Sequence, residues 1–398
     1  MTINKGLTHY MQNKAKVVWI EITRVIAALG ILFYHSSLYY TDYVYTPTPE
    51  GLSANWQTLS SVLTDKFGHG FSAVAGFISL FGFQFLDVFI LLIGLTMALS
   101  WRGEENYLNY IKRRWLRVLW PFWLAVLFNF ILSALDSYLL DGYIAPSWNW
   151  FAAFTFPLAF DYHGKLIQHI SGPWWFVPFM LAVIVVSPFM LKKANEWGIK
   201  NFLLFFGLLT LIYRLLSIYV FGAHTNYSTI TTAVGDAPFL LIPAKIFLIA
   251  LGIVFGTLIK ESQLPKSKLK LFFGAILLYF IGFMAQFYWL GWTIAEFFYA
   301  PAIVILLYVV FSEINQRFFT TLMTKLGALS YSFFLIHDFF ANRSFKHLGT
   351  ESLSAFWQTI VLSTIFSIVV ALLIEKLIPY FSKAFSDGWS YIDQKLML

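Results

Sequence analysis

The stretch EITRVIAALGILFYH, residues 21–35, decides how this chain is interpreted. It lies inside an apolar run from about residue 17 to residue 38, which is long enough to cross a bilayer as one α-helix. The run nevertheless contains Arg24 and His35. Ionisable groups at membrane depth are costly, so each is a candidate functional residue. Eleven residues make close to three helical turns and roughly 16 Å, so both side chains are expected on one side of the helix.

The composition is that of a membrane protein. Hydrophobic residues make up 59% of the 398 residues and charged residues only 12%, whereas a soluble domain has about 25% charged residues. The chain has no cysteine, which excludes thiol nucleophiles, disulfides and thiolate metal sites. The first apolar run has span length and no small-residue cleavage site, so it is not a signal peptide. We assign the net charge of +7 to cytoplasmic loops, not to nucleic-acid binding.

Apolar segments continue almost to the C-terminus and predict an all-α membrane helix bundle with about ten transmembrane helices. The Gly-rich stretch 67–81 either lengthens the second span or lies in the membrane interface. The predicted spans are residues 17–38, 82–100, 116–138, 173–191, 201–221, 239–259, 270–290, 292–312, 327–345 and 354–377.

The distribution of Lys and Arg residues predicts the orientation. Most of the 27 basic residues lie in alternate connecting segments, beginning with the N-terminus. Because cytoplasmic loops carry the excess of Lys and Arg, both termini are expected in the cytoplasm. This divides the chain into a cytoplasmic N-terminus (1–16), a membrane domain (17–377) and a cytoplasmic amphipathic tail (378–398). We therefore expect a multi-pass protein of the plasma membrane.

Two long loops are predicted on the outer side, at residues 39–66 and 139–172. Both are aromatic and polar, and the second contains Trp148, Trp150 and Asp161. Long loops within a compact fold are usually functional. Aromatic and polar residues in alternation suit stacking against sugars, and they equally suit anchoring at the membrane interface.

Three arginines surround the start of the third predicted span. Arg113, Arg114 and Arg117 precede Pro121 and an aromatic stretch, and Arg114 and Arg117 share a helix face. One interpretation is an ordinary positively charged cytoplasmic cap. The other is a site for a pyrophosphate-bearing donor such as coenzyme A, because arginines bind phosphates bidentately.

The histidines and the other buried charges also have two interpretations each. Arg24 can snorkel to the interface, and His35 can bond a neighbouring helix or act as a general base. His337 is predicted near mid-membrane, like His35, and Asp338 points about 100° away from it, so Asp338 is not an obvious orienting partner. Asp87 can orient His35 as a hydrogen-bond acceptor.

Arg214, Glu296 and Lys245 also fall inside predicted spans. A buried arginine needs a carboxylate or carbonyl groups, so a structural ion pair of Glu296 with Arg214 or Lys245 is the favoured interpretation.

These residues resemble the motifs of acyltransferase family 3, a family of integral-membrane acyltransferases. The family's first span carries a basic residue, ten further residues and a histidine, and Arg24 and His35 have that spacing. Its first cytoplasmic loop carries Arg-x-x-Arg before an aromatic and proline stretch, which is similar to Arg114, Arg117 and Pro121.

Further motifs extend the resemblance over essentially the whole chain. Asp87 and Gly94 are similar to a second-span motif, although Ile93 stands where the family usually has serine. GPWWF at 172–176 resembles the Trp-Phe pair that opens a middle span of the family. LGALSYSFFLIH at 326–337 resembles its C-terminal motif.

The resemblance implies a ten-span O-acyltransferase that uses acyl-CoA, in the simplest case acetyl-CoA, and no metal. The acceptor would be a hydroxyl of an extracytoplasmic or lipid-linked glycan, or else a lipid, a peptide or an antibiotic, since the family spans these acceptors and nothing in the sequence chooses among them. The chain either completes transfer alone or passes the acyl group to a separate extracytoplasmic transferase. The other expected partners are membrane lipids, with no nucleic acid. The implied catalytic residues are His35, Arg24, His337 and Asp87, and the implied donor-binding residues are Arg113, Arg114, Arg117, Trp175 and Tyr331.

A proton-coupled exporter of polysaccharide or small solutes is the alternative function. Buried His, Arg and Glu residues suit such a transporter. Transporters often carry Gly- or Pro-interrupted helices at matching positions in two halves. The sequence has no such paired signature, and a cluster of cytoplasmic arginines is less expected there, so acyl transfer is preferred.

Overall fold

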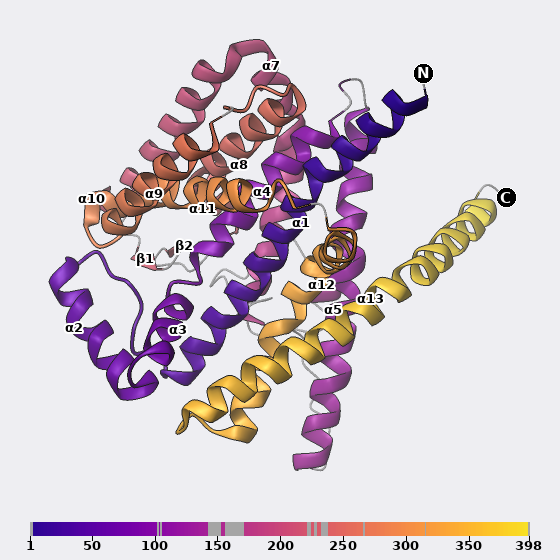
Figure 1. The fold of residues 1–398 in the computed structure, drawn as a ribbon. Helices are drawn as coiled ribbons and strands as arrows, with labels where there is room; N and C mark the ends of the chain where they lie inside the picture. The colour runs from indigo at the N-terminus through magenta and orange to yellow at the C-terminus, as the bar shows by residue number, and fades with distance from the viewer. Residues whose placement is uncertain are drawn as a thin grey trace.

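The computed structural model describes residues 3–101, 103, 106–141, 153–155, 171–220, 224–226, 229–231, 238–265, 267–314 and 316–396. These residues are almost entirely helical (Figure 1), which confirms the all-α prediction. The exception is one antiparallel hairpin of β1 (His224–Asn226) and β2 (Thr229–Thr231). Most of the predicted loop 139–172, with Trp148, Trp150 and Asp161, lies outside the described residues.

Seven helical segments among the described residues are long and apolar enough to cross a membrane, and a bent pair, α3 and α4, makes an eighth. The helices are α1 (Ile3–Tyr40), α2 (Leu52–Val62), α3 (Phe71–Leu80), α4 (Gln84–Ser100), α5 (Tyr107–Asp141), α7 (Phe176–Leu215), α8 (Pro238–Lys260), α9 (Lys268–Ala285), α10 (Trp289–Trp292), α11 (Ala295–Phe311), α12 (Arg317–Leu348) and α13 (Leu353–Leu396). Short π-helical or 3₁₀ turns are Leu63–Phe67, Gly172–Trp175 and Leu216–Val220.

The helices differ from the predicted spans in four places. The predicted spans 173–191 and 201–221 both fall in α7, whose helical geometry breaks at Gly198 (φ 71°, ψ 159°), a conformation that glycine adopts without strain. The span predicted at 292–312 is α11, with 17 residues. The stretch 67–81 contains α3, which bends by 51° into α4. The tail predicted at 378–398 is not a separate helix, because α13 continues through Pro379 to Leu396.

Helix α1 runs between two groups of helices. Figure 1 shows α4, α8, α9 and α11 on one side of it, and α5, α12 and α13 on the other. α1 packs mainly along α12, α4 along α8, and α12 also along α13. The start of α1 and the end of α13 lie toward the same end of the bundle (Figure 1). We call this end the arginine-rich end, because α5, which carries Arg113, Arg114 and Arg117, begins there. We call the end that carries α2 and α3 the opposite end.

Glycines allow the closest helix contacts. A Cβ atom on Gly94 of α4 would lie 2.1 Å from the backbone oxygen of Ile249, and one on Gly252 of α8 would lie 2.0 Å from that of Leu91. Small residues of this kind let membrane helices pack backbone to backbone. On the other side of the bundle, a Cβ on Gly327 of α12 would lie 2.3 Å from Oε2 of Glu21. Glycine thus brings α12 against α1, the helix of Arg24 and His35.

Candidate active site

A pocket of about 660 Å³ lies at the arginine-rich end, among α1, α4, α5, α7, α12 and α13. Arg24, Arg113, Arg114 and Arg117 all line it. These four cations, which the sequence assigned to donor binding or to the catalytic residues, thus line one pocket although they come from two helices. The rest of the wall is mostly apolar or aromatic, so the pocket combines a cationic rim with an apolar interior.

The arginines are held in different ways. Nη2 of Arg114 donates to Oγ of Ser100 at 2.5 Å, and its guanidinium lies 4.7 Å from the centre of the Tyr110 ring, a cation–π distance. Arg24 forms an ion pair with Glu21, with Nη1 2.8 Å from Oε1. Arg117 is exposed at the start of α5. Clustered guanidinium groups of this kind suit polyanionic ligands such as phosphates.

The aromatic residues predicted beside a donor occupy different places. Tyr331 lines the pocket, and its hydroxyl donates to the backbone oxygen of Val118 at 3.2 Å. Trp175 is not among the described lining residues; its ring packs against Phe176 and Phe179, with centroids 5.9 and 6.0 Å away. Phe176 lines the pocket instead. The preceding Trp174 is fully buried and donates from Nε1 to the backbone oxygen of Leu335 at 2.8 Å.

The structure brings His35 and His337 together. Their ring centroids are 5.2 Å apart and the rings meet edge to face at 67°. This contact follows from the packing of α1 along α12. Nδ1 of His337 lies 2.7 Å from the backbone oxygen of Phe334, so Nδ1 carries the proton and Nε2 is the acceptor. Nε2 is buried and has no hydrogen-bond partner among the described residues.

The carboxylate beside His35 is Asp338, not Asp87. Oδ1 of Asp338 lies 3.4 Å from Nδ1 of His35 and accepts a hydrogen bond from the Tyr39 hydroxyl at 2.8 Å. Oδ2 accepts from Ser171 at 3.3 Å. The sequence interpretation set Asp338 aside because it points away from His337. That reasoning concerned α12 alone; the packing of α1 along α12 brings His35 within reach of both His337 and Asp338.

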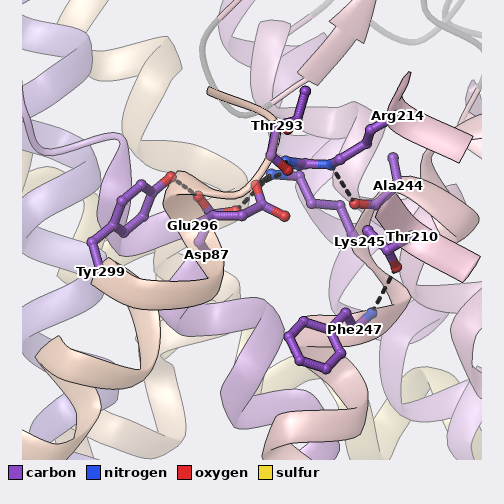
Figure 2. Close-up of polar contacts among 9 residues, drawn as sticks. All are labelled: Asp87, Thr210, Arg214, Ala244, Lys245, Phe247, Thr293, Glu296 and Tyr299. Atoms are coloured by element: carbon purple, nitrogen blue, oxygen red, sulfur yellow. Dashed lines mark hydrogen bonds and ion pairs between the residues drawn. The ribbon is translucent and has the colours of Figure 1, made fainter. Parts of the chain in front are cut away.

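Asp87 belongs to a different cluster, which lies among α4, α7, α8 and α11 (Figure 2). Oδ1 of Asp87 is 2.8 Å from Nζ of Lys245, and Oδ2 accepts a hydrogen bond from Tyr299. Asp87 and Lys245 are 0% and 1% exposed. The prediction that Asp87 orients His35 is therefore wrong, because Asp87 pairs with Lys245 and Tyr299, and the carboxylate next to His35 is that of Asp338.

The same cluster confirms the predicted structural pairing of Arg214 and Glu296. Nη2 of Arg214 lies 2.6 Å from Oε2 of Glu296, which Lys245 also contacts. Arg214 further donates to the backbone oxygens of Ala244 and Thr293, both at 2.9 Å. Two cations and two carboxylates thus compensate one another in the interior, as buried charges require.

Phe334 connects the pocket to the histidine pair. It lines the pocket, its backbone oxygen accepts from His337, and its ring centroid is 5.6 Å from that of His337. His35 and His337 themselves are not among the described lining residues. The sequence analysis did not predict this separation of the pocket from the histidines. Only the periodicity of α12, which puts Phe334 and His337 on one face, could have suggested it.

The membrane-type helix bundle thus holds buried His337 and partly exposed His35 close to a pocket whose arginines suit an anionic ligand. The match to known families makes this specific: the profile of the acyltransferase domain of acyltransferase family 3 covers residues 17–376. The chain belongs to that family, and it is a multi-pass membrane acyltransferase. Searches of the curated proteins and of the solved structures found no match to this chain.

Proposed function

We propose that this protein transfers an acyl group, in the simplest case acetyl, from acyl-CoA to a hydroxyl of an extracytoplasmic or lipid-linked glycan. His35 is the general base. The observation that carries the proposal is that the two helices of the histidine pair also line the arginine-lined pocket. α1 supplies Arg24 and His35, and α12 supplies Tyr331 and His337.

The pocket binds the donor. The phosphates of coenzyme A lie against Arg113, Arg114 and Arg117 at the rim, and Arg24 contributes a further positive charge from α1. The pantetheine arm extends along the apolar wall toward Phe334. A guanidinium binds phosphate through parallel hydrogen bonds that lysine cannot reproduce, which supports a phosphate-bearing ligand for this group of arginines.

The histidine pair activates the acceptor. Asp338 lies next to Nδ1 of His35, which favours the tautomer with the proton on Nδ1 and leaves Nε2 as the proton acceptor. Nε2 takes the proton of the acceptor hydroxyl while its oxygen forms a bond to the thioester carbonyl carbon. The carbon–sulfur bond then breaks, and the leaving coenzyme A thiolate takes the proton that Nε2 of His35 accepted. His337 packs edge to face against His35 and fixes the orientation of its ring.

We propose ten spans with both termini in the cytoplasm. The two halves of α7 on either side of Gly198 count as two spans, α3 with α4 as one, and α11 as one. This arrangement puts the arginine-rich end at the cytoplasm, where acyl-CoA is found. The Lys and Arg distribution favours the same orientation, and we propose the plasma membrane as the location.

The experiment uses cells that produce the wild-type protein, no protein, or the variants His35→Ala and His347→Ala. His347 is the matched control because it is an exposed histidine on α12. Mass spectrometry of the surface glycans should show acylation with the wild type and with His347→Ala. His35→Ala should reduce it on the order of 10²- to 10⁴-fold, the usual contribution of a general base.

Normal acylation by a correctly inserted His35→Ala protein would contradict the assignment of the base. A second measurement separates transfer from export. Purified protein in vesicles is supplied with radiolabelled acetyl-CoA and with glycolipid extracted from the cells that lack the protein. Incorporation of label into the glycolipid supports an acyltransferase, and a transporter would incorporate none.

A further inference from the structure

Three phenylalanines close the inner end of the arginine-lined pocket. Phe89, Phe176 and Phe334 all line it, and they come from α4, α7 and α12. The Phe334 ring centroid lies 6.2 Å from that of Phe89 and 5.2 Å from that of Phe176. Phe176 and Phe334 are 3% and 4% exposed. We call these three side chains the phenylalanine floor.

Each phenylalanine is the lining residue of its helix that lies farthest from the arginines. α4 ends at Ser100, which Arg114 contacts, and Phe89 is near its other end. α12 passes Glu21 at Gly327 before it reaches Phe334. α7 begins at Phe176 and runs toward Val185, whose backbone oxygen accepts from Tyr107 at the start of α5. The floor therefore lies at the end of the pocket opposite its cationic rim.

The histidine pair lies directly behind the floor. The Phe334 ring is 5.6 Å from that of His337, and His337 is in ring contact with His35. An acyl group that enters from the arginine side meets the three rings before it reaches the imidazoles. Close-packed aromatic rings leave few gaps, so they exclude added methylene groups.

We infer that the phenylalanine floor selects short acyl groups and that Phe334 is its specificity-determining residue. This inference rests on the proposed function, because it concerns the acyl group of the same donor. Acetyl and similarly short groups pass between the rings, whereas longer chains clash with Phe334. The side chain of Phe334 belongs to the floor, whereas its backbone oxygen accepts the hydrogen bond from His337. A smaller side chain at position 334 therefore opens the floor, and the hydrogen bond from His337 to the backbone oxygen is kept.

The test measures binding of coenzyme A thioethers with ethyl, butyl and hexyl chains to the full-length protein in detergent. These probes cannot transfer their chain, so the measurement does not depend on turnover. In the wild type the affinity should fall as the chain lengthens. Phe334→Ala should raise the affinity for the hexyl probe relative to the ethyl probe by about tenfold or more, because one methylene in a pocket is worth about tenfold or more.

Two further variants keep the test decisive. Phe89→Ala removes the ring that α4 contributes to the floor. Like Phe334→Ala, it should raise the affinity for the hexyl probe relative to the ethyl probe. Phe206→Ala removes a buried phenylalanine of α7 that is not among the described lining residues. The affinity for the hexyl probe relative to the ethyl probe should therefore stay at the wild-type value. The ethyl probe can bind tightly while no variant changes the affinity for the hexyl probe relative to the ethyl probe. That result would overturn the role of the floor and leave the proposed function standing. Absence of binding by every probe to the wild type would instead overturn the donor site itself.

Discussion

The carboxylate of Asp338 lies 3.4 Å from Nδ1 of His35 and connects α12 to α1 at the level of the histidine pair. Hydrogen bonds from Tyr39 and Ser171 hold both of its oxygens. The carboxylate is only 9% exposed, so its position is well determined by its neighbours. Such a group can hold one tautomer of a histidine and stabilise the imidazolium that forms during proton transfer.

Asp338→Asn is expected to reduce acyl transfer about tenfold or more. Asparagine keeps the size of the side chain and can still accept from Tyr39, but it removes the negative charge beside His35. The rate of acetyl transfer in reconstituted vesicles measures the effect. Asp136→Asn is the control, because Asp136 pairs with Arg343 at 2.8 Å on a partly exposed surface. Equal rates for the two variants would show that Asp338 does not support the base.

Arg117→Gln is expected to raise KM for acyl-CoA by about 10- to 100-fold with a smaller change in kcat. Losing a hydrogen bond to a charged group costs about 1.5–3 kcal/mol, and the phosphates are bound alike in the ground state and the transition state. Arg117→Lys should recover only part of the loss. Lys112→Gln is the control, since Lys112 is exposed and is not among the described lining residues. A change in kcat alone would argue against a phosphate contact.

Local spacing was sufficient to predict the parts of the site that lie on one helix. The periodicity of a helix places Arg24 and His35 on one face of α1. It likewise places Arg114 and Arg117 on one face of α5. The helix boundaries were less predictable where two spans continue into one another. Apart from the break at Gly198, the polar stretch 192–201 stays helical within α7 and forms no separate loop, and Pro379 does not end α13.

Contacts between helices could not be predicted, because a single sequence contains no distances. The sequence offered Asp87 as a possible partner of His35 and set Asp338 aside, and only the packing of α1 against α12 shows that Asp338 is the carboxylate next to His35. The phenylalanine floor is a further example. Phe89, Phe176 and Phe334 are three of the chain's 44 phenylalanines, and only the packing of α4, α7 and α12 sets them apart from the others.

The glycine contacts predict a graded effect on stability. Gly94→Ala would put Cβ 2.1 Å from a backbone oxygen of α8, and Gly327→Ala would put it 2.3 Å from the Glu21 carboxylate. Overpacking typically costs about 1–3 kcal/mol. Gly94→Ala should lower the melting temperature in detergent more, because its closest neighbour is a backbone oxygen, whereas the closest backbone atom to Gly327, Cα of Glu21, would lie 2.9 Å away.

Gly274→Ala is the control for the glycine series. Gly274 lies within α9, and no atom lies within 4 Å of its ideal Cβ position. Alanine is favoured over glycine inside a helix by about 1 kcal/mol, so the melting temperature should stay the same or rise. If Gly94→Ala, Gly327→Ala and Gly274→Ala lowered the stability equally, close helix packing would not explain the loss. The helix pairs α4–α8 and α1–α12 would then pack less closely than described.

The buried cluster around Lys245 gives the sharpest test of the role of Asp87 (Figure 2). Asp87→Asn leaves the cluster with Lys245 and Arg214 against the single carboxylate of Glu296. Breaking a buried pair on one side costs about 3–5 kcal/mol, so the melting temperature and the amount of folded protein should fall. Glu313→Gln is the control, because Glu313 pairs with Lys268 at 2.7 Å but is 80% exposed, and such surface pairs contribute about 0–1 kcal/mol.

The double variant Asp87→Asn/Lys245→Met separates a structural role from a catalytic one. It removes one cation and one carboxylate together and leaves the pair of Arg214 and Glu296, whose atoms lie 2.6 Å apart. Replacing a whole buried ion pair by uncharged groups is often neutral or stabilising, so the double variant should regain most of the stability lost in Asp87→Asn. Acyl transfer should return with it if Asp87 only holds α4 against α8. If the double variant folds as well as the wild type and remains inactive, Asp87 takes part in the reaction, and its pairing with Lys245 does not explain its presence.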